Sequence, residues 1–148
     1  MVTQDEASTL ANATFGPGKE VANAGHPKGC IYGSQTKNVL DVVVAQAPDA
    51  ATAQAGFSQA LGQAQAQVAT EVPPGVHVNL NSANAEGIGD KATTITWSYS
   101  GGGATIAFTG IYVLSGATFF TIGDLVTGTS PATLTALKDQ AQVVLGRI

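Results

Sequence analysis

The second half of the sequence holds three strand-like stretches, the first two of which alternate large side chains with smaller ones, and this pattern leaves few folds open. The stretches are 94–100, 106–114 and 119–126, separated by Gly101-Gly102-Gly103 and by Ser115-Gly116. Successive side chains of a β-strand point to opposite faces, so a period of two is typical of strands. Short connections join only antiparallel neighbours. The sequence therefore predicts an antiparallel meander.

The same region contains no charge between Lys91 and Asp124, so a membrane-spanning helix over 104–122 is an alternative. A spanning helix needs about 20 predominantly apolar residues. Here the apolar run is interrupted by Gly110 and by Ser115-Gly116, and threonine recurs throughout. The alternation favours strands.

The first half predicts a hairpin and a further short strand. Cys30-Ile31-Tyr32-Gly33 and the β-branched run 39–44 are typical of strands, and a polar turn at 35–38 separates them. The alternation of Val76, Val78 and Leu80 indicates a short strand at 76–80. Residues 16–28 are rich in Gly, Pro and Asn and predict a loop.

Three helices are expected. Thr3 and Glu6 form a capping box that starts a helix over 3–13. Pro48-Asp49 starts an Ala/Gln-rich helix over 50–69, and Ser130-Pro131 caps the last helix. The order is α-β-β-α-(β)-β-β-β-α. We predict a single α+β domain over 1–148, with an antiparallel sheet and the helices packed on one face of it.

Composition excludes some functions. Charged residues make up 11% of the chain, less than half the usual share of about 25%. The six lysines and arginines are scattered singly, so we expect no nucleic-acid binding. The polar surface must come from Thr, Ser, Gln and Asn, a composition that suits a protein working outside the cytoplasm.

The residues that could carry chemistry are few. Cys30 is the only cysteine, and His26 and His77 are the only histidines. A zinc site needs about four ligands, and nucleophilic catalysis by Cys30 needs an adjacent base; the spacing supports neither. We expect no metal, no cofactor and no enzymatic activity. Of the acids, Asp41 and Asp124 are interpreted as strand-face or turn residues, and Asp90 as an acceptor for backbone N–H groups in its turn.

Large aromatic side chains gather on one predicted face of the meander. They are Trp97, Tyr99, Phe108 and Tyr112, with Phe120 as a further member. Such a face is either hydrophobic core or the wall of a ligand pocket, and both alternatives stay open. A cleft between the rings and the covering helices is the candidate binding site.

Three pieces of the sequence together resemble a known group of proteins. They are Cys30-Ile31-Tyr32 after a Gly-rich loop, Gly87-Ile88-Gly89-Asp90-Lys91-Ala92 entering a strand, and a C-terminal helix with spaced Leu and Ala. In these respects the chain is similar to the small extracytoplasmic lipoprotein and sensor-type domains of actinobacteria and related bacteria. The resemblance implies export, and a lipid anchor on an upstream cysteine that this sequence lacks. It supplies no catalytic residues.

We therefore expect a non-enzymatic extracytoplasmic domain, tethered to the membrane in its full-length form, whose signal peptide is missing from this sequence. Its partner would be a small apolar ligand or a protein. The alternative is a structural or interaction module that acts through a sheet edge or through the Ala/Gln helix. An enzyme using Cys30 is the least favoured hypothesis.

Overall fold

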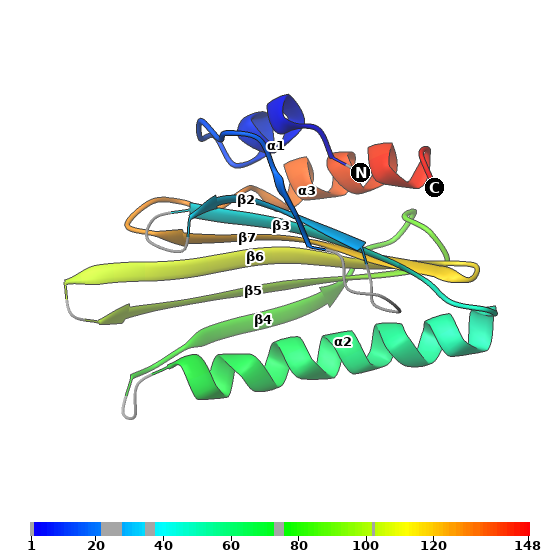
Figure 1. Ribbon diagram of the computed structural model, residues 1–148. Coiled ribbons are helices and arrows are strands. Elements are labelled where there is room, and N and C mark those ends of the chain that lie inside the picture. The colour runs from blue at the N-terminus through cyan, green and yellow to red at the C-terminus, as the bar shows by residue number, and fades with distance from the viewer. Residues whose placement is uncertain (1, 22–27, 35–37, 73–75, 102) are drawn as a thin grey trace.

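The computed structural model describes residues 2–21, 28–34, 38–72, 76–101 and 103–148. Within them, seven strands form one antiparallel sheet in the order β1-β2-β3-β7-β6-β5-β4 (Figure 1). The strands are β1 (Lys19–Val21), β2 (Lys28–Ser34), β3 (Asn38–Gln46), β4 (Asn79–Asn84), β5 (Lys91–Gly101), β6 (Ala104–Ser115) and β7 (Thr118–Thr127). The helices are α1 (Gln4–Leu10), α2 (Ala50–Glu71) and α3 (Leu134–Leu145). The α+β class is confirmed.

The predicted meander is confirmed as β5-β6-β7, with each strand antiparallel to the next. The predicted hairpin is confirmed as β2-β3, although residues 35–37 of its turn lie outside the described residues. The hairpin joins the meander because β3 pairs along its whole length with β7. The prediction of a loop over 16–28 is wrong for residues 19–21, which form the edge strand β1, and β4 begins at Asn79 rather than at 76.

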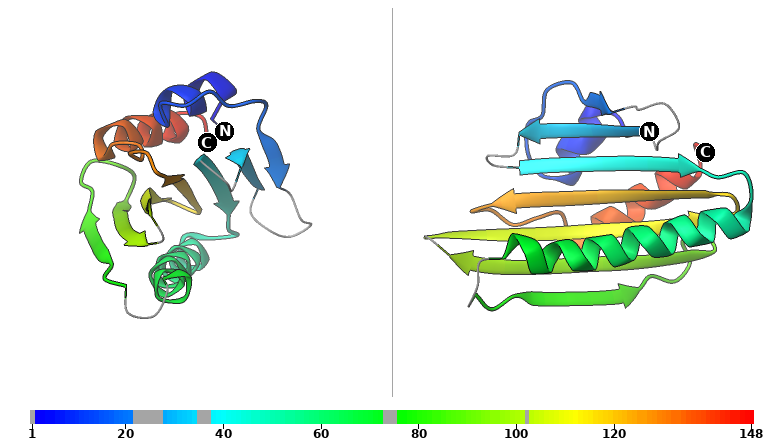
Figure 2. Two further views of the ribbon diagram at one scale, coloured as in Figure 1. Left: turned by 90° about the vertical axis from the view of Figure 1, so that its left-hand side faces the viewer. Right: turned by 60° about the horizontal axis from the view of Figure 1, so that its bottom comes forward.

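The prediction that the helices share one face of the sheet is wrong. α1 and α3 lie on one face and α2 lies on the other (Figures 1 and 2). The reason is that the central strands are apolar on both sides. One set of strand side chains packs under α1 and α3: Leu40, Val42, Ile111, Val113, Phe120 and Ile122. Another set packs against α2: Ile95, Trp97, Leu114 and Phe119. Two apolar faces require two covering layers.

The caps set the ends of the helices. The Thr3–Glu6 capping box is present, as predicted, but α1 ends at Leu10, and Asn12 adopts a left-handed φ of 47°. Asp49 caps α2 by accepting the Thr52 N–H. The cap of α3 is Thr133 rather than Ser130-Pro131, because its side chain accepts the Ala136 N–H.

An ion pair connects the two helical ends on the α1 and α3 face. Arg147 donates two hydrogen bonds to the Glu6 carboxylate, at 2.6 and 2.9 Å. These bonds, together with the Thr3 N–H, lower the pKa of Glu6 to about 2. The contact holds the chain ends side by side, as Figure 1 shows.

The Gly87-Ile88-Gly89-Asp90 turn fastens β5 to the β6–β7 turn. Asp90 donates its backbone N–H to the Leu114 carbonyl at 2.8 Å, and its carboxylate accepts the Gly116 N–H at 2.6 Å. The predicted role of Asp90 as an acceptor of backbone N–H groups is therefore confirmed, although the N–H comes from the neighbouring turn. Gly89 has a φ of +59°, and a Cβ there would lie 2.5 Å from the Leu114 carbonyl oxygen.

We predict that Gly89→Ala lowers the free energy of unfolding by about 2 kcal/mol, because it adds a steric clash to left-handed strain. Gly87→Ala is the matched control, since Gly87 has a φ of +78° and its surroundings leave open space for a methyl group. It should cost only about 1 kcal/mol. Urea denaturation of both variants measures the difference. Equal losses of unfolding free energy would show that the contact between a Cβ at position 89 and the Leu114 carbonyl does not affect stability.

Candidate functional site

The four predicted aromatic residues lie together on the α2 face of the sheet. Trp97 stacks on Tyr99 at 6.1 Å and on Phe108 at 5.7 Å between ring centroids. Tyr112 packs against the same cluster. Phe120, the further member expected from the sequence, is on the opposite face under α1 and α3, and its neighbour Phe119 takes a place on the α2 face instead. This correction follows from the alternation along β7.

Helix α2 covers only part of this aromatic cluster. Its C-terminal half, with the residue that follows it, contributes Leu61, Ala64, Val68 and Val72 to the packing. Trp97 is 7% exposed and belongs to the core. Tyr99, Phe108 and Tyr112 stay half-buried. Trp97 is therefore part of the hydrophobic core, whereas the rings of Tyr99, Phe108 and Tyr112 are only partly covered.

Two facing glycines lie beside Phe108. Gly110 and Gly123 are paired across β6 and β7. A Cβ at Gly110 would lie 2.6 Å from the Phe108 ring, and one at Gly123 would lie 2.9 Å from it. The absence of both side chains lets the ring lie flat over the sheet. A Cβ at Gly123 would also lie 2.7 Å from an Asp41 carboxylate oxygen, so Phe108 and Asp41 flank the same glycine.

Asp41 is the functional candidate that the sequence interpretation missed as a site residue. It projects from β3 on the α2 face, between Ile31 of β2 and Gly123 of β7. Burial raises the pKa of its carboxyl group to about 6, and the charge on Asp124 adds to the rise. Burial also raises the pKa of Tyr112 to about 12, with a contribution from the charge on Asp41. The phenol and the carboxylate are therefore electrostatic neighbours.

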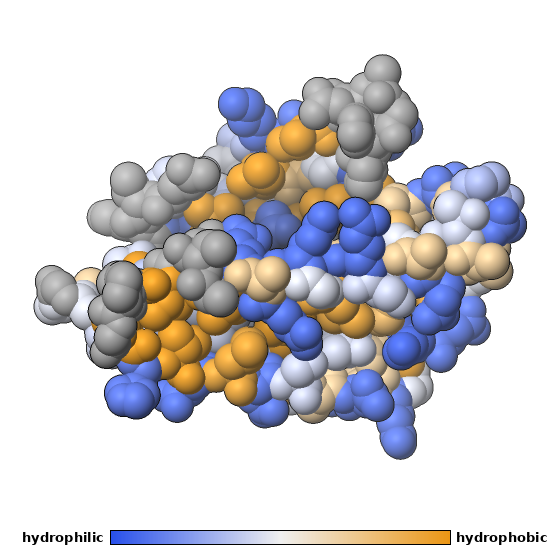
Figure 3. Space-filling model, turned by 90° about the horizontal axis from the view of Figure 1, so that it is seen from below, coloured by the Kyte–Doolittle hydropathy of each residue, from blue (hydrophilic) through white to orange (hydrophobic). Residues whose placement is uncertain are grey.

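Around Asp41, a strip of apolar residues is exposed at its outer end on β1 and β2 and half-buried on β3. We call it the open strip and define it as Val21, Ile31, Val39, Asp41 and Val43. Val21 is 41% exposed and Ile31 is 38% exposed, although both are large apolar residues. In the second view of Figure 2, α2 follows the meander and leaves β2 and β3 beside it. Figure 3 looks onto this side and shows apolar surface in its upper part as well as near the helix.

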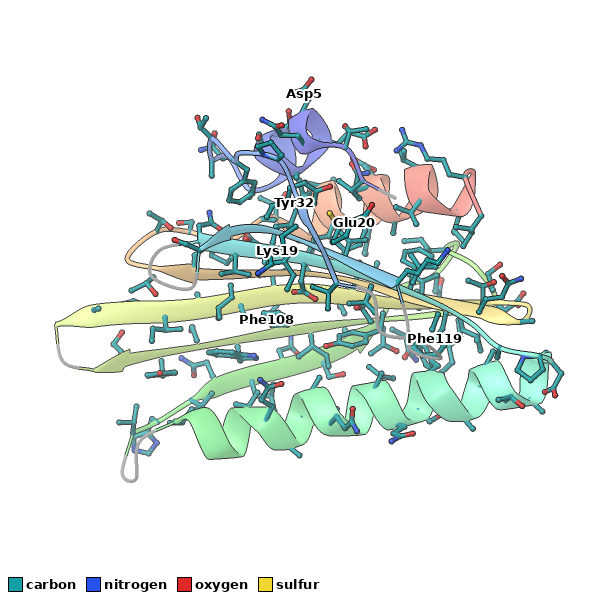
Figure 4. All side chains as sticks on the ribbon, viewed as in Figure 1. Asp5, Lys19, Glu20, Tyr32, Phe108 and Phe119 are labelled. Atoms are coloured by element: carbon teal, nitrogen blue, oxygen red, sulfur yellow. The ribbon has the colours of Figure 1, made fainter. Side chains whose placement is uncertain are left out.

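Lys19 is the cation that the register brings to the open strip from β1. It pairs with Ile31, which in turn pairs with Asp41. Figure 4 shows Lys19 and Glu20 on β1, and Phe108 and Phe119 between the sheet and α2. Lys19 is exposed, and the structure records no ion pair for it within the described ranges.

Two open hollows lie near the far edge of the sheet. One, of about 450 Å³, is lined by Tyr99 with residues of the α2–β4 connection and of β4 and β5, including His77 and Ser98. The other, of about 390 Å³, is lined by Trp97 and Phe108 together with uncharged polar residues such as Asn79, Asn81 and Thr96. Trp97, Tyr99 and Phe108 thus border a hollow, but the second hollow also contains Ala107, Thr109 and Pro131 and therefore lies mainly on the α3 side of the sheet.

The residues considered for catalysis are not assembled into a site. Cys30 is 7% exposed and packs under the α1 and α3 layer, while His77 is exposed beside the hollow at Tyr99. His26 lies outside the described residues. Over the ranges described, no three His, Cys, Asp or Glu side chains gather as metal ligands would. None of the described helices is both long enough and apolar enough to cross a membrane.

Asp124 is a second buried acid, on the face opposite Asp41. Its residue is fully buried, and one carboxylate oxygen accepts the Ala132 N–H at 2.7 Å. The other oxygen has no hydrogen-bond partner within the described structure. Burial raises the pKa of Asp124 to about 6, and the Ala132 hydrogen bond opposes that rise. Because it is enclosed, Asp124 belongs to the core and the loop before α3, outside any binding surface.

The comparisons with known proteins leave the identification open. A search of protein-family models, of curated proteins and of solved structures finds no match to this chain.

Proposed function

We propose that this chain is a non-enzymatic binding domain that takes a small, mostly apolar ligand on the open strip, with Phe108 and Tyr112 as the inner wall. The observation that carries the proposal is the exposure of Val21 and Ile31 on the sheet face that also holds the half-buried rings of Phe108 and Tyr112. A sheet face is normally covered by another layer, and exposed contiguous apolar surface marks a binding site.

The position of α2 supports this choice of site. Its N-terminal half is anchored by Ala53 and Phe57, and the Phe119 ring lies against Gly56, where a Cβ would be 2.7 Å away. The helix therefore forms a fixed wall beside the open strip. A ligand bound there would contact β2 and β3 below and the Phe108 ring at its inner end. Ligand sites combine apolar walls with a few polar groups in this way.

The expected result is saturable binding of the neutral apolar dye N-phenyl-1-naphthylamine, detected by energy transfer from Trp97, the single tryptophan. Ile31→Gln should weaken binding about fivefold, because roughly 1 kcal/mol of apolar contact is lost. Val143→Gln is the matched control: Val143 is 40% exposed, but it lies on α3, across the sheet. Wild-type protein that binds no dye, or equal effects of the two substitutions, would contradict the proposal.

The second candidate function is a protein-interaction module, and the edge strand β4 favours it. All six residues of β4 are exposed and uncharged, and β4 is the last strand of the sheet. Such an edge offers unpaired backbone groups to a partner strand. Light scattering across a concentration series tests self-pairing. Association that Asn81→Lys abolishes would support this candidate, and a monomer at all concentrations would count against pairing between copies.

We also propose an extracytoplasmic location with a membrane tether, as in the lipoprotein and sensor-type domains that the chain resembles. The support is the low share of charged residues, 11%, and the quoted sequence motifs. Fractionation of cells that express the full-length gene product tests it. Recovery in the cytoplasmic fraction would overturn the location and would leave the binding proposal standing.

A further inference from the structure

We infer that the ligand of the open strip carries a positively charged head group on an apolar tail, and that Asp41 binds the head group. This inference rests on the proposed function and specifies the chemical class of its ligand. Asp41 is the only acid of the open strip, and the strip is otherwise apolar. A carboxylate in such surroundings is stabilised by an opposite charge, so a cationic head group complements the strip.

Few hydrogen-bond donors surround the Asp41 carboxylate. Its neighbours in the same cross-strand row are Ile31 and Gly123, and beyond Gly123 comes Gly110. None of these side chains can donate a hydrogen bond. Asp41 receives only its own backbone N–H among the described donors. Desolvation of a partly buried carboxylate with so few donors destabilises its ionised form, and a cationic ligand would offset that destabilisation.

The other elements packed around Asp41 supply little charge that could replace the ligand. On this face, β7 offers Thr121 and Leu125, and β6 offers the Tyr112 phenol. The sequence of α2 holds no charged residue from 50 to 70. Asp124 of β7 carries the same sign as Asp41 and projects to the other face. Two lysines lie on this face: Lys91 of β5, three strands from β3, lies over the Phe57 ring of α2, and Lys19 of β1 is two strands away, which corresponds to roughly 10 Å between backbones.

Lys19 is placed to compete with a cationic ligand for the Asp41 carboxylate, and it forms no ion pair with Asp41 in the described structure. Its side chain is exposed and records no ion pair in the described structure, and Ile31 lies between it and Asp41. When no ligand is bound, its long side chain could approach the carboxylate across Ile31. Removing the lysine should therefore strengthen the binding of a cationic ligand, which gives the inference an independent test.

The experiment compares three monomeric compounds that share an octyl tail: octyltrimethylammonium, octyl glucoside and octyl sulfate. Each displaces N-phenyl-1-naphthylamine from the intact domain at pH 7.5. We expect octyltrimethylammonium to displace the dye at about one tenth of the concentration that octyl glucoside needs, because one charge interaction in a partly buried site contributes about 1.4 kcal/mol. Octyl sulfate should be the weakest. Equal displacement by all three would overturn this inference, while failure of the dye itself to bind would overturn the proposed function.

Substitutions then assign the preference to Asp41. Asp41→Asn should reduce the preference for the ammonium compound over octyl glucoside to within twofold, and Lys19→Ala should increase that preference. Asp139→Asn, on an exposed residue of α3, is the control and should change nothing. A preference that survives Asp41→Asn would overturn the inference.

A measurement on the wild-type protein keeps the inference testable if Asp41→Asn does not fold. Because the carboxyl group of Asp41 has a pKa of about 6, it loses most of its charge between pH 7.5 and pH 5. The affinity for octyltrimethylammonium should fall at least fivefold over that range, while the affinity for octyl glucoside stays constant. A pH-independent preference would contradict the assignment to Asp41.

Discussion

Phe57→Ala should lower the free energy of unfolding by about 3–5 kcal/mol, the usual cost of deleting a fully buried phenylalanine ring. Phe57 is 0% exposed and packs with Ala53 and Leu114. The ammonium of Lys91 lies 5.5 Å from the centre of its ring, which adds a cation–π contact. Because α2 is built mostly of Ala and Gln, few other side chains can replace this anchor.

The control for Phe57→Ala is Gln59→Ala, two residues further along α2, where the side chain is exposed. It should change stability by less than about 0.5 kcal/mol. Guanidinium denaturation followed by circular dichroism measures both variants. If Phe57→Ala lowers stability no more than Gln59→Ala does, α2 does not pack against Leu114 and Phe119 as described. In that case α2 cannot form a wall of the proposed binding site.

The elements of the fold were predictable because local signals specify them. Alternation marked β5 and β6, a short connection followed by an apolar stretch marked β7, and the capping residues Thr3 and Asp49 marked two helix starts. The placement of the helices was not predictable in the same way. It depends on which strands pair, and the pairing of β3 with β7 brings together residues about 80 positions apart. That pairing builds a wide sheet with two apolar faces, which one layer of helices cannot cover.

The candidate site was predictable in part. The sequence placed Trp97, Tyr99, Phe108 and Tyr112 on one face, and the structure brings them together. Asp41 could not be placed near these rings from the sequence, because β3 joins the meander only through its pairing with β7 in the folded protein. One signal was present: Asp41 is a lone acid inside the β-branched run from Val39 to Val44. An acid is disfavoured in a buried strand, so its occurrence there indicates a role.

The two buried acids should make the domain less stable at neutral pH than in mild acid. Asp41 and Asp124 both have pKa values raised to about 6, so the folded state binds their protons more tightly than the unfolded state does. Their protonation therefore stabilises the folded state, and that stabilisation is lost as the pH rises from about 4 through 6. Each carboxyl should lower the free energy of unfolding by about 2 kcal/mol between pH 4.5 and pH 7. Glu6 has the opposite shift, and its contribution is lost mainly below this window.

Asp124→Asn should remove at least half of this loss, because the amide cannot ionise while its oxygen can still accept the Ala132 N–H. At pH 7 the variant should be more stable than the wild type. The charge on Asp124 also raises the pKa of Asp41, so the substitution should reduce the pH dependence that comes from Asp41 as well. Urea denaturation at pH 4.5, 5.5, 6.5 and 7 measures the effect, with Asp139→Asn as the exposed control. An unchanged slope in Asp124→Asn would mean that the buried carboxyl is ionised throughout, stabilised by a donor to its second oxygen.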